Sequence, residues 1–128
     1  MTWFDLLLLG KIGVTLVAVA LPFLLLPAPQ IARLFDAPVA AAPLFRLYGV
    51  AILALLVGYA SGLSWWHGPG FAAGVAWMGL VSNGGAVTAM VLHGRAGGRN
   101  LPLALFFAFV TVALTASLLH PAMALGRL

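Results

Sequence analysis

The chain has no cysteine and no glutamate, and only 6% of its 128 residues are charged. Without cysteine it has no disulfides, no thiolate metal ligands and no thiol nucleophile. Its two acidic residues, Asp5 and Asp36, are expected near the membrane surface, so paired-carboxylate catalysis is not supported. The sequence also lacks a glycine-rich phosphate loop, zinc-ligand spacing and a nucleophile triad. These absences favour a protein that is not an enzyme.

Polar residues are too few to cover a small soluble domain. Hydrophobic residues make up 64% of the chain, and its mean hydropathy is +1.16. A soluble domain of this size keeps much of its surface in water and needs polar side chains there. The net charge of +4 comes from basic residues scattered at the ends of apolar runs. This scatter indicates topology signals and lipid contacts, and not a nucleic-acid surface. We therefore predict an all-α integral membrane protein in a lipid bilayer.

Prolines and turn residues divide the chain into four apolar runs. We predict spans at residues 3–26, 44–64, 71–92 and 101–119. Each is close to the ~20 residues that cross the hydrocarbon of a bilayer. Short connections between successive spans predict one transmembrane domain, residues 1–128, folded as a four-helix up-down bundle.

The first connection, residues 27–43, is longer than the others. It carries Ile31, Leu34 and Phe35 at helical spacing, beside Arg33 and Asp36. This pattern is typical of a short amphipathic helix on the membrane surface, and an irregular apolar loop is the alternative. Asp36 is within reach of Arg46 at the start of span two, which predicts an interfacial ion pair between them. A solvated arginine at that position is the alternative.

The basic residues near the span ends predict the orientation. Four arginines fall on one side: Arg33, Arg46, Arg95 and Arg99. Arg127 and Lys11 fall on the other. Cytoplasmic loops are enriched in lysine and arginine. We therefore expect the connections 27–43 and 93–100 in the cytoplasm and both termini outside.

The stretch GLVSNGGAVTAM, residues 79–90, places turn-forming residues inside the third span. A turn there would leave backbone groups unpaired in hydrocarbon, so a helix is predicted to continue through it. Small side chains then form a packing stripe, with Asn83 at its border: Gly79, Ser82, Ala86 and Ala89. Span four offers a matching stripe: Ala104, Ala108, Thr111 and Thr115. Helix packing is the main interpretation, and a broken helix lining a ligand site is the alternative.

Lys11 is the one lysine of the chain, and it lies inside the first span. It is eight residues past Trp3, about 12 Å along a helix. Its helix face also carries Thr15 and Pro22. The lysine either reaches the headgroups with its long side chain or faces the protein interior. In the second case, the ligand or ion site would include Lys11 and Tyr59 with Asn83, Thr111 and Thr115.

The positions of the three histidines do not predict a metal or haem site. His67 is expected in a turn, His120 at a helix end before a proline, and His93 on the opposite side. A haem held between two helices needs two inward histidines at one depth. We predict no metal ligands and no catalytic residues.

Residues 44–59, LFRLYGVAILALLVGY, resemble the pattern of DoxX-like small four-helix bacterial membrane proteins, in which Arg-x-x-Gly precedes an apolar run and a second glycine. The short chain, four spans and long first connection also resemble this family. The resemblance implies a multi-pass protein of the bacterial inner membrane, with a stress-related or quinone-linked role. It implies no catalytic residue.

Two functions follow from these features. The leading hypothesis is an accessory or assembly subunit, present as a homo-oligomer or within a larger membrane complex, because small-residue stripes favour helix–helix contacts. The alternative is a small transporter or lipid- or quinone-binding protein with an interior site near Lys11 and Asn83. No cofactor is expected, although a bound quinone or lipid fits the alternative.

Overall fold

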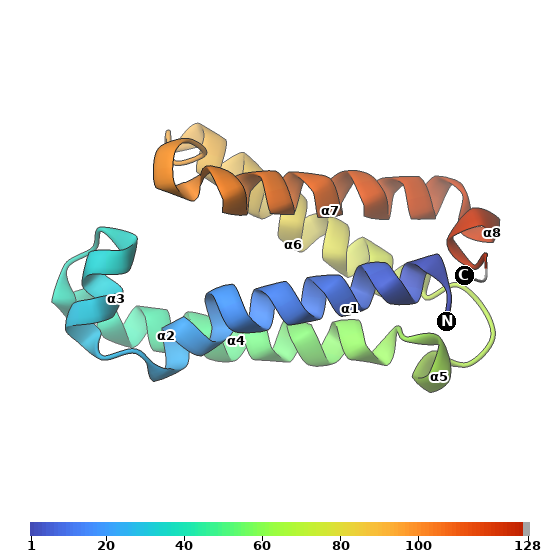
Figure 1. The fold of residues 1–128 in the computed structure, drawn as a ribbon, viewed down its shortest axis with the longest axis horizontal. Coiled ribbons are helices and arrows are strands. Elements are labelled where there is room, and N and C mark those ends of the chain that lie inside the picture. Colours follow the sequence, from blue (N-terminus) through green and yellow to red (C-terminus); the bar gives the residue numbers. More distant parts are fainter. Residues whose placement is uncertain (127–128) are drawn as a thin grey trace. The chain divides into compact units, whose positions relative to one another are not determined.

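The structure is a computed structural model that describes residues 1–126, and every regular element in this range is helical (Figure 1). The all-α prediction is confirmed. In chain order the elements are α1 (Trp3–Thr15), the π-helix η1 (Leu16–Ala20), α2 (Leu21–Leu25), α3 (Ala28–Phe35), the 3₁₀-helix η2 (Val39–Ala41), α4 (Ala42–Ser61), α5 (Ser64–His67), α6 (Ala73–Leu92), the 3₁₀-helix η3 (Gly98–Asn100), α7 (Leu101–Leu119) and α8 (Pro121–Ala124). Arg127, which the orientation argument uses, lies outside the described residues.

Four helical stretches are long and apolar enough to cross a membrane: Trp3–Leu25, Val39–Ser61, Ala73–Leu92 and Gly98–Leu119. They are the helices of a multi-pass membrane protein. Their ends lie within a few residues of the predicted spans. The largest shift is in the second stretch, which starts early because Pro43 sits in the first turn of α4. Proline is tolerated there, since the first backbone N–H groups of a helix have no partner within the helix.

The chain forms two compact units. One is Leu9–Ala60, and the other combines Met1–Leu8 with the chain from Ser61 onward. The prediction of a single four-helix up-down bundle stays a prediction.

In the 9–60 unit, α1 continues through η1 into α2, and the chain returns in α4 (Figure 1). Pro22 has no N–H for the carbonyl of Ala18, four residues back. The π-helix precedes this proline, and the N–H of Leu21 bonds the carbonyl of Leu16, five residues back. Such single π turns commonly adapt a helix to an irregularity. This π turn was not predicted from the sequence.

In the same unit, aromatic rings from α2, α3 and α4 pack against one another. The ring of Phe23 lies 4.6 Å from that of Phe35 and 5.3 Å from that of Phe45, between centroids. Gly49 of α4 meets α2 so closely that a Cβ there would lie 2.9 Å from Leu24 Cδ2. Ile31 of α3 is fully buried. The apolar face of α3 therefore contacts the protein, and its place on the membrane surface stays a prediction.

In the other unit, α6 packs against α7 (Figure 1). The helix runs unbroken from Ala73 to Leu92, so the predicted helix through residues 79–90 is confirmed. A Cβ on Gly84 would lie 3.6 Å from the Thr111 methyl carbon, which is ordinary contact. Near the chain start, the ring of Phe4 lies 4.9 Å from that of Phe71.

Candidate functional site

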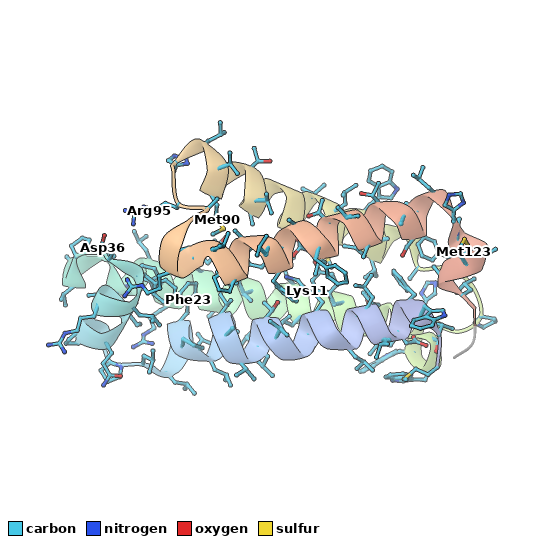
Figure 2. The ribbon with its side chains drawn as sticks, turned by 45° about the horizontal axis from the view of Figure 1, so that its top comes forward. Lys11, Phe23, Asp36, Met90, Arg95 and Met123 are labelled. Carbon is cyan, nitrogen blue, oxygen red and sulfur yellow. The ribbon has the colours of Figure 1, made fainter. Side chains whose placement is uncertain are left out.

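Lys11 is buried, with only 5% of its surface exposed (Figure 2). Its Nζ lies 6.0 Å from the ring centroid of Tyr59, a fully buried residue of α4. An ammonium at this distance over an aromatic face is attracted by the negative π-cloud. The structure thus brings two predicted site residues together, with the lysine in the interior orientation.

Thr15 follows Lys11 by one helical turn and is 6% exposed. Within residues 1–126 its Oγ1 is buried and has no hydrogen-bond partner. A helical threonine commonly donates to the carbonyl four residues back, which would satisfy this hydroxyl. Thr15 instead stands directly before the π-helix. A buried hydroxyl without a hydrogen-bond partner is rare in native proteins and needs an explanation. A ligand that accepts a hydrogen bond from Thr15 is one such explanation.

Three other predicted site residues belong to the unit that combines residues 1–8 with the chain from Ser61 onward. Their side chains bond to their own helices. Asn83 Nδ2 donates to Gly79 O at 2.7 Å. Thr111 Oγ1 donates to Phe107 O and Thr115 Oγ1 to Thr111 O, both at 2.8 Å. These bonds satisfy the three side-chain donors within their own helices, as in packed membrane helices. A site that joins these residues to Lys11 stays a prediction.

The predicted packing stripes differ in burial along their length. Gly79 and Ala104 are buried, Ser82, Ala86 and Ala108 are half-buried, and Ala89 is exposed. Gly84, which was not among the predicted packing residues, also lies at the contact between α6 and α7. Part of the small-residue surface is therefore buried by contacts within the chain itself.

The carboxylate of Asp5, near the start of α1, accepts four hydrogen bonds, and only 1% of this residue is exposed. Its Oδ2 accepts hydrogen bonds from Thr2 N at 2.7 Å and Thr2 Oγ1 at 2.9 Å. Its Oδ1 and Oδ2 accept from Ser64 N and Ser64 Oγ, both at 2.7 Å. The N–H of Asp5 in turn donates to Thr2 Oγ1 at 3.1 Å, which completes a capping box at the start of α1. The expected depth of Asp5, near the membrane surface, stays a prediction, and the burial of its carboxylate among these donors was not predicted from the sequence.

Arg46 stabilises the turn after α2. Its guanidinium donates to the backbone carbonyls of Phe23 at 2.6 Å and Leu26 at 2.5 Å. Asp36 is the exposed C-cap of α3, in the left-handed region with φ 51°. The ion pair between Asp36 and Arg46 stays a prediction, and the role of Arg46 at these carbonyls was missed.

Comparison of the chain with protein families, with curated proteins and with solved structures finds no match. The resemblance of residues 44–59 to DoxX-like proteins stays a prediction. Function is therefore inferred from the side chains themselves.

Metal chemistry has no residue cluster to support it: among residues 1–126, no three histidine or acidic side chains are grouped to hold an ion. The Lys11 cluster has a different chemistry. An ammonium, a hydroxyl and an aromatic ring offer hydrogen-bond donors and positive charge inside an apolar span. This arrangement can bind an oxygen-bearing group.

Proposed function

We propose that the protein binds an amphiphilic small molecule, a lipid or a quinone, within the bacterial inner membrane. The observation that carries this proposal is the pair of buried polar side chains Lys11 and Thr15 on one face of the first span. Both lie in the 9–60 unit, with Tyr59 from α4 beside the lysine. Transport of the same molecule would use the same residues.

The physical argument is that a charge inside a membrane span is unfavourable and needs compensation. Ionisable residues there face the protein or water and commonly mark a ligand or ion pathway. The hydroxyl of Thr15 adds a second polar group in the same place. A ligand oxygen would accept a hydrogen bond from this hydroxyl beside the ammonium of Lys11, while the ligand's apolar part would remain within the apolar span.

Purification in mild detergent followed by mass spectrometry of the bound lipids and quinones tests the proposal. We expect Lys11→Met and Thr15→Val to lower the amount of the retained molecule several-fold, because each removes a hydrogen-bond donor. Thr88→Val is the matched control, since the Thr88 hydroxyl is exposed, bonds its own helix and belongs to no predicted site. Equal retention by all four proteins would exclude a site at Lys11.

The accessory-subunit hypothesis has its own supporting observation. Gly10 and Gly13 of α1 are exposed, and in the described part of the chain nothing lies within 4 Å of a Cβ added to either. Such open small residues allow another helix to approach closely. We expect Gly13→Leu to shift an oligomer or complex toward the monomer in native mass spectrometry. A wild-type chain that is monomeric in mild detergent would contradict this second function.

We further propose an up-down arrangement of four spans, with both termini outside and α3 at the cytoplasmic surface. The arginines Arg33, Arg46, Arg95 and Arg99 support this orientation. Because the chain has no native cysteine, single cysteines are clean reporters of topology. A cysteine at Gly97 should react with a membrane-impermeant reagent only after the cells are opened, and reaction in intact cells would reverse the orientation.

A further inference from the structure

We propose that the short helix α5 is a membrane-interface anchor: the indoles of Trp65 and Trp66 lie at the boundary between lipid headgroups and acyl chains, and Asp5 positions them. This surface does not depend on a ligand at Lys11. The chain holds the backbone of α5 in place, yet both indoles are exposed, Trp65 at 61% and Trp66 at 73%. An ordered backbone that presents two large uncovered aromatic rings is typical of a binding surface.

Contacts at the start of α5 fix its backbone. Ser64, its first residue, donates from its backbone N and from Oγ to the carboxylate of Asp5, both at 2.7 Å. Leu63, the residue before it, is buried at 4% exposure. A Cβ added to Gly62 would lie 2.9 Å from Val75 Cγ1, so the chain passes very close to α6 at this point. The position of α5 is therefore set by α1 and α6, and not by the packing of its two indoles.

The two indoles follow directly after a membrane span. The apolar stretch Val39–Ser61 is long enough to cross a bilayer, and α5 begins at Ser64. Its partner Asp5 lies in the first turn of α1, which begins another such stretch, Trp3–Leu25. Tryptophan is enriched where a span meets the headgroups, because its ring is apolar while its N–H needs a hydrogen-bond acceptor. The ester carbonyls of phospholipids are acceptors at this level of the bilayer.

The charge of this segment favours a zwitterionic lipid interface over a charged partner. Residues 61–72 contain no lysine, arginine, aspartate or glutamate, and their histidine, His67, carries no formal charge at pH 7. The carboxylate of Asp5 is turned to Ser64 and Thr2, and only 1% of this residue is exposed. A protein or anionic headgroup recognised through its charge would find no opposite charge in this segment. A zwitterionic interface requires an apolar ring and a hydrogen-bond donor, and an indole supplies both.

Tryptophan fluorescence of the full chain in phosphatidylcholine nanodiscs tests the anchor. Combining Trp3→Phe with Trp77→Phe leaves Trp65 and Trp66 as the emitting residues. We expect their emission to be shifted to the blue of indole in water. Lipids brominated near the headgroup end of the acyl chains should quench it more strongly than lipids brominated near the chain ends, because the indoles lie at the interface.

Three results of this measurement would overturn the anchor. Emission like that of indole in water, without quenching by brominated lipid, would place Trp65 and Trp66 outside the bilayer. Stronger quenching by the deeper bromine would place them in the hydrocarbon core. Blue-shifted emission that neither lipid quenches would show that protein covers them, such as a second copy of the chain.

Ser64→Ala tests the positioning role of Asp5 with a mild change, since it removes the Oγ donor and keeps the backbone donor. It should weaken the preference for shallow bromine, because α5 is then held less tightly and its indoles sample a wider range of depths. The matched control is a chain in which Trp77, 57% exposed on α6, is the one tryptophan left. Its quenching should be the same with and without Ser64→Ala. Unchanged quenching of Trp65 and Trp66 in Ser64→Ala, or an equal change at Trp77, would contradict the positioning role.

Discussion

Asp5→Asn is expected to lower the free energy of unfolding by about 3 kcal/mol or more, since hydrogen bonds to charged groups contribute roughly 1.5–3 kcal/mol each. The carboxylate of Asp5 accepts from two donors of Thr2 and two of Ser64. An asparagine of the same shape replaces one acceptor oxygen with an NH₂ group, which faces these donors and repels them. The contacts join the start of α1 to the start of α5, 59 residues away in sequence. Denaturation of the purified protein by increasing sodium dodecyl sulfate, followed by circular dichroism, measures the change.

Asp36→Asn is the matched control for this prediction, because the side chain of Asp36 is exposed. It removes the only other acidic group of the chain and should change stability little. Thr2→Val, which removes one donor to Asp5 and the acceptor of the Asp5 N–H, should have an intermediate effect. If Asp5→Asn and Asp36→Asn behave alike, the hydrogen bonds around Asp5 do not stabilise the fold.

The spans could be predicted because their physical cause is local. Hydropathy sets the length of a span, and prolines or glycines set its ends, so Ala73–Leu92 and Gly98–Leu119 were found within three residues. The second span was misplaced at its start, because Pro43 was treated as a boundary although it fits the first turn of a helix. The π-helix was missed since its hydrogen bonds depend on how the helix adapts before Pro22.

The candidate site was predictable only in part. Lys11 and Tyr59 were paired by estimating their depth in the membrane, which follows from counting residues along helices. The partnerless hydroxyl of Thr15 depends on a side-chain rotamer and the adjoining π turn, which no pattern of residue types reports. The capping box of Thr2 and Asp5 was visible as a Thr-x-x-Asp pattern, but its link to Ser64 is a contact between distant segments.

Arg46→Leu is expected to destabilise the protein by about 2–4 kcal/mol, because it leaves backbone carbonyls without donors at the end of an apolar helix. The sequence explains why these carbonyls need a side chain. In a helix, the carbonyl of Phe23 would accept from the N–H of residue 27, but residue 27 is proline. The guanidinium supplies the missing donor to Phe23 and a second one to Leu26. Sodium dodecyl sulfate denaturation again measures the loss.

Two variants separate this role of Arg46 from a simple charge effect. Arg46→Lys keeps the charge but not the planar fork of donors, so it should recover only part of the stability. Arg33→Leu removes an exposed arginine from the neighbouring α3 and should change little. An ion pair with Asp36 would instead make Asp36→Asn as damaging as Arg46→Leu. Full stability in Arg46→Lys, together with a loss in Asp36→Asn, would show that Arg46 acts through its charge and not by capping the end of the first span.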